Sequence, residues 1–176
     1  MPLLRNDAFV ADDWAAYADD VVLVEGGKVI VTSVRLIRDW DSLAKFTGLL
    51  GVSLANSERV EVLIPYISQL SLVVLNFPSY TDGRAYSQAK DLRLAGYCGA
   101  LRATGNLLLD QFQYMNQMGF DSFEVSERFS LTQWQAASRQ MSLAYQRGLT
   151  RLGMETEVWT ERHLDLNAGE KQPHAS

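Results

Sequence analysis

One stretch of sequence decides the fold: LVVLNFPSYTDGR, residues 72–84. Its first six residues, Leu72–Phe77, form an apolar run of strand length, and Pro78 with the polar residues behind it ends that strand. In α/β proteins, ligands bind at the carboxyl ends of strands, where such turns face one another. The turn after Phe77 is therefore the first place to look for a functional site.

From this stretch onward, predicted strands alternate with predicted helices. The strands are Leu72–Phe77, Leu101–Thr104 and Ser122–Val125. The helices between them carry apolar residues at helical spacing: Ala85, Ala89 and Leu92 in the first, with Gln88 and Asp91 facing solvent, and Leu108, Phe112 and Met115 in the second. This alternation predicts an α/β fold with a parallel βαβαβ layer and right-handed crossovers. It leaves open whether the layer is Rossmann-like or a half-barrel.

The chain before residue 72 is predicted to be less regular. A Gly-Gly turn between the β-branched runs Val21–Val24 and Lys28–Thr32 predicts an N-terminal antiparallel β-hairpin. Other predictions in this half are a helix over Asp12–Asp20, a helix over Ser42–Leu50 and a strand over Arg59–Ile64.

A C-terminal amphipathic helix is predicted to begin at Ser130, where Ser-Leu-Thr-Gln forms a capping box with Gln133. Its apolar stripe consists of Trp134, Ala137, Met141, Ala144 and Tyr145. Periodicity is lost beyond Trp159. We therefore predict a single α/β domain over residues 1–165 and a disordered tail over 166–176.

The composition bounds the class of protein. The chain has 176 residues, of which 47% are hydrophobic and 21% charged, as in an ordinary globular protein. A net charge of -5 opposes a nucleic-acid or anionic-membrane surface, and no apolar run reaches the roughly 18 residues of a membrane helix. Cys98 is the only cysteine, which excludes an internal disulfide and a cysteine-based metal cluster. We expect a cytoplasmic protein without a metal site, and the cofactor stays open.

The turn Ser79–Arg84 combines groups that suit an anion, namely hydroxyls, a guanidinium and the amides of a helix N-terminus. Residues 84–102 contain four basic residues and one acidic residue, a local charge of +3. The candidate ligand-binding residues are Tyr80, Thr81, Asp82, Gly83, Arg84, Ser87, Arg102 and Gln111. A second interpretation stays open, in which Asp82 caps the helix and pairs with Arg84 or Arg102 in a purely structural ion pair.

Other chemistry-bearing residues give weaker indications. Neither Gly83 nor Gly105 lies in a G-x-G-x-x-G fingerprint, so no Rossmann cofactor site is predicted. Cys98 is interpreted as a small buried hydrophobe, because no histidine stands near it in the sequence. Tyr80 and Tyr86 either stack on a planar ligand or cover the strand ends.

An ordered series of motifs resembles a bacterial family, domain of unknown function 934. The motifs are Phe77-Pro78, Thr81-Asp82-Gly83-Arg84, Tyr86-Ser87, Leu92-Arg93, Leu101-Arg102-Ala103, Gly105, Leu109, Asp110-Gln111 and Gly119-Phe120. This chain departs from the family at Ala100, where relatives commonly carry Glu. The resemblance implies a context of assimilatory sulfate reduction, with sulfite reductase as a neighbouring gene product.

Three functions follow from the site and the resemblance together. The first is an accessory protein of sulfate and sulfite reduction that binds a small anion or a partner at the Asp82–Arg84 turn, with sulfite reductase as the candidate partner. The second is an oxidoreductase-type enzyme of sulfur metabolism, in which Asp82 is a general acid or base and Arg84 with Arg102 holds an oxyanion. The third is a structural interaction protein that docks through the Trp134–Tyr145 stripe. A homodimer stays open.

Overall fold

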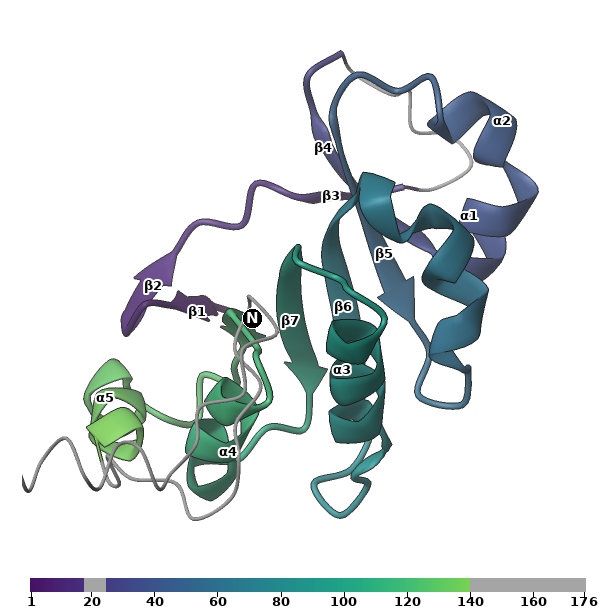
Figure 1. The fold of residues 1–176 in the computed structure, drawn as a ribbon. Helices are drawn as coiled ribbons and strands as arrows, with labels where there is room; N and C mark the ends of the chain where they lie inside the picture. Colours follow the sequence, from purple (N-terminus) through teal and green to yellow (C-terminus); the bar gives the residue numbers. More distant parts are fainter. Residues whose placement is uncertain (18–24, 140–176) are drawn as a thin grey trace, which may run out of the picture.

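The computed structural model describes residues 1–17 and 25–139 of the chain. In these residues the strands are β1 (Leu3–Arg5), β2 (Ala8–Val10), β3 (Ala15–Ala16), β4 (Lys28–Thr32), β5 (Leu49–Leu54), β6 (Leu70–Phe77), β7 (Ala100–Gly105) and β8 (Ser122–Glu124). The helices are α1 (Ser33–Arg38), α2 (Trp40–Leu43), α3 (Arg84–Leu94), α4 (Phe112–Gln117) and α5 (Leu131–Arg139), with 3₁₀ helices η1 (Val60–Gln69) and η2 (Leu109–Gln111) (Figure 1).

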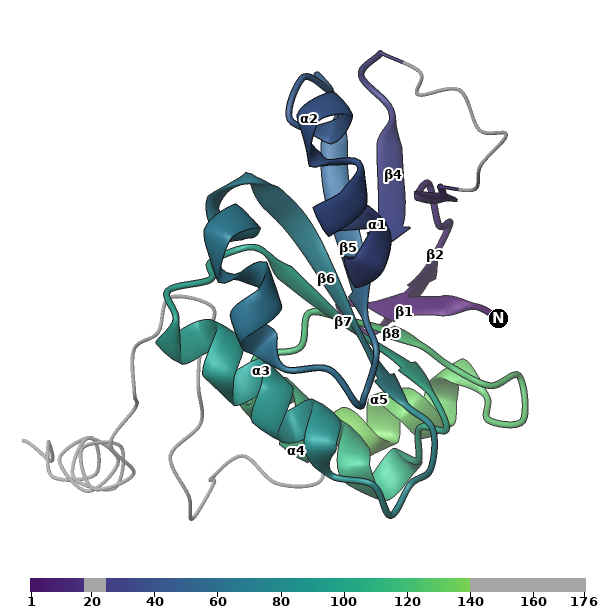
Figure 2. The ribbon, with the colours of Figure 1, turned by 90° about the vertical axis from the view of Figure 1, so that its right-hand side faces the viewer.

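The sheet is a curled half-barrel. Its order is β2-β1-β8-β7-β6-β5-β4-β3, so β4 to β8 lie side by side in chain order, and all four of these pairings are parallel. A Rossmann sheet reverses its strand order in the middle, whereas a barrel adds each strand on the same side of the last one. Figures 1 and 2 show α1 and α3 along one face of the curled sheet.

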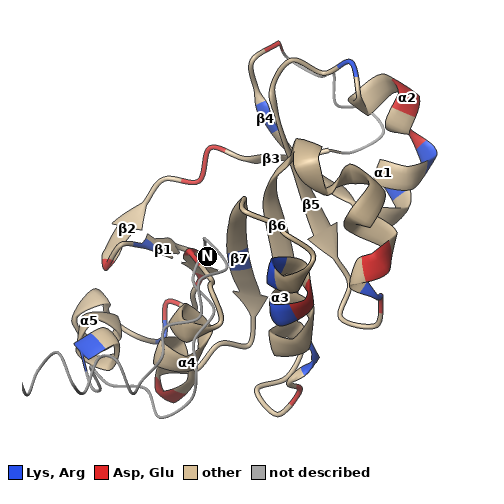
Figure 3. Cartoon of the chain, in the orientation of Figure 1, with Lys and Arg blue, Asp and Glu red and all other residues tan. Residues whose placement is uncertain are grey.

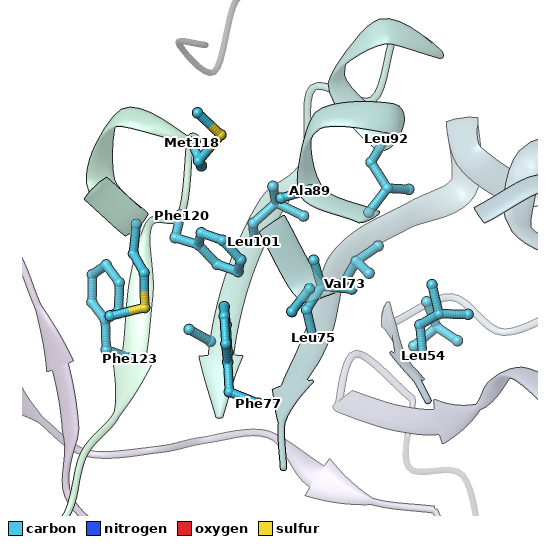
Figure 4. Close-up of a cluster of buried hydrophobic side chains, with 14 of the residues drawn as sticks. Leu54, Val73, Leu75, Phe77, Ala89, Leu92, Leu101, Met118, Phe120 and Phe123 are labelled. Carbon is cyan, nitrogen blue, oxygen red and sulfur yellow. The ribbon is translucent and has the colours of Figure 1, made fainter. Parts of the chain in front are cut away.

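The core lies between the sheet and the helices that cover it. Side chains alternate along a strand, so Val73, Leu75 and Phe77 of β6 point to the same face. There they join Ala89 and Leu92 of α3 in one buried cluster (Figure 4). Each fully buried Leu or Phe side chain contributes about 1.5–3 kcal/mol to stability. This packing fixes where α3 begins relative to the end of β6.

The opposite, concave face of the half-barrel is more polar. The register aligns Ser53, Val74, Arg102 and Ser122 across β5 to β8 in one layer. By the same alternation, the next layer toward the carboxyl ends holds Asn76, Thr104 and Glu124. A polar interior near the carboxyl ends of parallel strands is where barrel proteins build their sites.

The N-terminal residues connect the two edges of the parallel layer β4 to β8. β1 pairs antiparallel with β8 at one edge, and β3 pairs parallel with β4 at the other (Figure 1). Residues 11–17, here called the N-terminal strap, run between these edge pairings. The Trp14 ring packs on Gly51, since a Cβ at Gly51 would lie 2.9 Å from that ring.

The predicted parallel layer is confirmed. The three predicted strands correspond to β6, β7 and β8, which are adjacent and parallel. The capping box is also present, because Ser130 N–H donates to Gln133 Oε1 at 2.8 Å and Gln133 N–H donates to Ser130 Oγ at 3.4 Å. Trp134 and Ala137 are buried as predicted. The rest of the stripe, Met141, Ala144 and Tyr145, lies outside the described residues, as does the tail 166–176.

An N-terminal hairpin is present, but it is formed by β1 and β2 around a two-residue turn at Asn6 and Asp7, which both have positive φ. In the hairpin predicted from the Gly-Gly turn, the first arm, Val21–Val24, lies outside the described residues. The second arm is β4, whose two described neighbours both run parallel to it.

Three predictions in the first half were wrong. Ala15–Ala16 is a strand rather than part of a helix, because its backbone pairs with β4. Leu49 and Leu50 begin β5, a buried strand, instead of ending a helix. The segment predicted as a strand from Arg59 enters η1, a 3₁₀ helix that contains Pro65 and buries Val60 and Leu63.

Candidate functional site

Asp82 sits between two loops at the carboxyl edge of the sheet. Its Oδ2 accepts a hydrogen bond from Asn56 Nδ2 at 2.7 Å, and its Oδ1 accepts one from the Arg84 N–H at 3.2 Å. The Arg84 Nε lies 3.7 Å from the same Oδ1. Asp82 therefore ties the loop after β5 to the loop after β6 and closes the start of α3, as the structural interpretation predicts.

The turn uses several of its own donors. Asp82 N–H donates to the Ser79 carbonyl at 3.0 Å, and Thr81 N–H donates to Ser79 Oγ at 3.4 Å. Among the described residues, the Gly83 and Ala85 amides have no acceptor in the turn. The N–H of Gly83, which is exposed, and the exposed hydroxyl of Ser87 remain available to an anion at the helix N-terminus, whereas Ala85 is fully buried.

Tyr80 and Gln111 meet at the far side of this turn. Gln111 Nε2 donates to the Tyr80 carbonyl at 2.7 Å, which joins η2 to the loop after β6. Tyr80 is 54% exposed. Tyr80 and Gln111, both candidate ligand-binding residues from the sequence, therefore lie next to each other.

The structure does not bring Arg102 to the turn. Its Nη1 and Nη2 donate to the two oxygens of Asp12 at 2.8 and 3.0 Å, and Nη1 also donates to Glu124 Oε1 at 3.2 Å. Leu101 and Ala103 pack into the core, so strand alternation turns Arg102 to the concave face. Thr104 follows the same face and donates to Glu124 Oε2 at 2.7 Å. The proposed pairing of Arg102 with Asp82 is absent.

A cavity of about 430 Å³ opens beside the turn, between α3 and the loop that follows β5. It is lined by Asn56, Ser57, Glu58, Arg59, Val60, Glu61, Arg84, Ser87, Gln88 and Asp91. We call it the carboxyl-edge cavity. Of these residues, only Arg84 and Ser87 were candidates from the sequence. Gln88 and Asp91 lie in α3 and were predicted to face solvent. The remaining residues, 56–61, follow β5, whose first two residues were predicted to end a helix.

Gln88 anchors this cavity and is buried, which corrects the prediction that it faces solvent. Its Nε2 donates to the carbonyls of Ala55 and Glu58 at 2.9 and 2.8 Å. Glu58 in turn accepts from Ser33 Oγ at 2.6 Å and from the Ala55 N–H at 2.8 Å. The cavity wall is therefore held by a network of short polar contacts between α3 and the loop after β5.

Tyr86 closes the other side of the α3 N-terminus. Its ring centroid lies 4.9 Å from that of Phe77 and 4.8 Å from that of Tyr114. Burial raises the pKa of the Tyr86 hydroxyl to about 12, with smaller contributions from Tyr114 and Asp110. Tyr86 therefore covers the strand end, the second of the two roles considered for it.

This pKa predicts a loss of stability at high pH. The folded pKa is raised above the unfolded value of about 10, so Tyr86 contributes stability that is complete below pH 10 and is lost as the pH rises through about 12. We expect the free energy of unfolding to fall more steeply between pH 10 and 12 in the wild type than in Tyr86→Phe. Urea denaturation across this range measures the difference, and equal slopes would contradict the assignment.

Cys98 is exposed, which corrects the prediction of a buried thiol, and its Sγ lies 3.4 Å from the Gly96 carbonyl oxygen.

Over residues 1–17 and 25–139, no three His, Cys, Asp or Glu side chains form a group that could hold a metal ion. No helix in the same described ranges has both the length and the apolar character to span a membrane.

The comparison with protein families identifies the chain. A family model described as "Bacterial protein of unknown function (DUF934)" matches residues 51–152. The chain belongs to this family. The matched residues run from the third residue of β5 through α5 and include the whole carboxyl-edge cavity, whereas the N-terminal strap lies before them. No curated protein matches the chain.

In this DUF934 protein, the four basic residues between positions 84 and 102, which give that segment its charge of +3, lie in two different environments. Arg84 and Lys90 are exposed, whereas Arg93 and Arg102 are buried. Figure 3 shows basic and acidic residues together on α3. The guanidinium of Arg84 is therefore the basic group at the turn that is exposed to a ligand, with a side chain that is 68% exposed.

Proposed function

We propose that this DUF934 protein is an accessory protein of assimilatory sulfite reduction that binds a small oxyanion in the carboxyl-edge cavity. The proposal rests on one observation: two arginines, Arg59 and Arg84, lie in the wall of the same cavity at the start of α3. The sulfur context comes from the family resemblance. Sulfite reductase as the partner and the cytoplasm as the location belong to the same proposal.

The chemistry of the cavity supports binding of an oxyanion. A guanidinium presents N–H donors in a fork that matches the oxygens of sulfite or sulfate. Ser57 and Ser87 add hydroxyl donors in the cavity wall, and the exposed Gly83 amide, next to Arg84 in the chain, adds a further donor at the helix N-terminus. Donors of these kinds suit the binding and orientation of an anion, which supports an accessory role.

Carboxylates in the same wall set a limit on the affinity. Glu58 is occupied by its bonds to Ser33 and Ala55, whereas Glu61 and Asp91 are exposed and lower the local positive potential. Arg84 also lies near Asp82, although 3.7 Å is a loose contact for an ion pair. We therefore expect a dissociation constant on the order of 1 mM for sulfite.

The test is a thermal-shift titration with sulfite and sulfate on the wild type and on Arg84→Met. Binding to the native state alone raises the melting temperature in a concentration-dependent way. We expect both anions to raise it in the wild type and Arg84→Met to lose most of the shift. Arg128→Met, which removes an arginine stacked on Phe129 outside the cavity, is the matched control and should keep the shift. An equal shift in all three proteins would refute the site.

The accessory role is tested in cells with the same variants. A deletion strain should grow poorly on sulfate or sulfite and normally on cysteine. Arg84→Met should fail to restore growth, while Arg128→Met should restore it. Normal growth of the deletion strain on sulfate, with unchanged sulfite reductase activity in extracts, would contradict the sulfur role without affecting the anion site.

A further inference from the structure

A second cavity lies at the opposite end of the strands, beside the N-terminal strap. Its volume is about 470 Å³, within the ~300–1,000 Å³ range of small-molecule sites. Its residues come from the amino-terminal ends of β4 to β8, from β1 and β2, and from the strap. We call it the strap cavity.

Several charged groups in its wall already have partners. Lys28 Nζ forms an ion pair with Asp13, and the hydrogen bond from Lys28 holds the pKa of the Asp13 carboxyl below its ordinary value. Asp121 Oδ2 accepts from the Leu101 N–H at 2.9 Å and from Arg93 Nη2 at 3.4 Å. These charged groups are already paired within the protein, so they require no counter-charge from a ligand.

The polar groups that are left over are donors. Arg102 is 2% exposed, and its two Nη groups are used by Asp12 and Glu124. Its Nε–H is buried and has no acceptor in the described part of the chain. Arg5 has no carboxylate within 4.0 Å among the same residues, and the Ser122 hydroxyl makes no hydrogen bond there. A buried donor without an acceptor favours an incoming acceptor group.

The remaining wall is apolar and includes one aromatic ring. Trp14, held against Gly51, lies in the same wall as Leu72, Leu3 and Val10. Such a wall favours a ligand with an apolar body, since apolar surface is removed from water on binding. Asp12 also demonstrates that the Arg102 guanidinium holds a carboxylate in a two-pronged geometry at this position.

We propose that the strap cavity binds a small organic carboxylate with an apolar body. The carboxylate is held by Arg5 and the Arg102 Nε–H, and the apolar body packs on Trp14 and Leu72. This site is separate from the carboxyl-edge cavity and does not depend on the proposed role in sulfite reduction.

The test uses three probes on the full chain, namely benzoate, its neutral analogue benzamide, and acetate, which lacks the ring. Calorimetric titration should detect saturable binding of benzoate below about 10 mM, and neither benzamide nor acetate should saturate in that range. Two-dimensional NMR should place the benzoate-induced shifts on the Trp14 indole N–H and the Ser122 amide. No saturable binding of benzoate, or equal binding of benzamide, would overturn the proposal.

Variants distinguish this site from the other cavity. Arg5→Met removes an exposed charge and should weaken benzoate binding at least about tenfold. Ala100→Leu places a larger side chain in the cavity wall and should also weaken it. Arg59→Met, in the carboxyl-edge cavity, should leave the benzoate affinity unchanged. Wild-type affinity in Arg5→Met and Ala100→Leu alike, or a loss in Arg59→Met, would refute the assignment.

Discussion

Arg93→Ala is expected to lower the free energy of unfolding by about 3–5 kcal/mol, because two buried carbonyl oxygens and one partly buried carbonyl oxygen each lose a donor at a cost of about 1–3 kcal/mol. Arg93 Nη1 donates to the carbonyls of Tyr97 and Gly99 at 2.8 Å, and Nη2 donates to that of Gly119 at 2.7 Å. These bonds join the end of α3 to the turns that precede β7 and β8. Urea denaturation followed by circular dichroism measures the loss.

Two further variants make this expectation specific. Arg93→Lys retains the charge but lacks the fork that reaches several carbonyls, so it should recover only part of the stability. Arg59→Ala removes an exposed arginine and should change stability by less than about 0.5 kcal/mol. If Arg93→Ala were as stable as Arg59→Ala, these hydrogen bonds would have no net effect on folding.

Gly105→Ala is expected to destabilise the protein by about 3 kcal/mol or more. Gly105 ends β7 with φ +100°, and a Cβ there would lie 2.4 Å from the Phe77 carbonyl oxygen and 2.6 Å from Asn76 Oδ1. Both the backbone conformation and the collision with β6 therefore oppose a side chain. The melting temperature should fall by about 2–4 °C for each kcal/mol.

Gly96→Ala separates the two causes. Gly96 also has positive φ, +88°, but nothing lies within 4 Å of the position of its Cβ. Only the conformational cost of about 1–2 kcal/mol should then remain. If Gly96→Ala and Gly105→Ala lowered the free energy of unfolding equally, the collision with β6 would have to be relieved by a small shift of the strands.

The parallel layer could be predicted because its signals are local. Each of its three predicted strands is a short run bounded by turn residues, and Gly96 and Gly119, which end α3 and α4, both have positive φ. The N-terminal residues carry no such signal. β1 has its register set by β8, where Leu4 pairs with Phe123, and β3 has its register set by β4. The pairing of β1 depends on residues far away in the sequence. The helix over Asp12–Asp20 was predicted from the i, i+3 spacing of Trp14 and Tyr17, which was misleading because Ala15 and Ala16 pair with β4.

The candidate site was predicted in part for a similar reason. Asp82, Arg84 and Gln111 were placed correctly, because a turn after a strand defines the carboxyl edge. Arg102 was misplaced, although the alternation of buried Leu101 and Ala103 around it indicates that it faces away from α3. Asn56 was missed because its position depends on β5. The homodimer and the sulfur context stay predictions.

The strap also affects the order in which the protein can fold. Leu4 is synthesised early, but its partner Phe123 leaves the ribosome only after β4 to β7 have been made. During translation, the β8 edge of the sheet does not yet exist, and the first strands must wait without their final partner. Pairing across such a sequence separation is slow because of the entropy of closing the loop. We therefore expect the parallel layer to assemble first and β1 with β2 to add last, so that the β8 edge is covered only when synthesis of the domain is nearly complete.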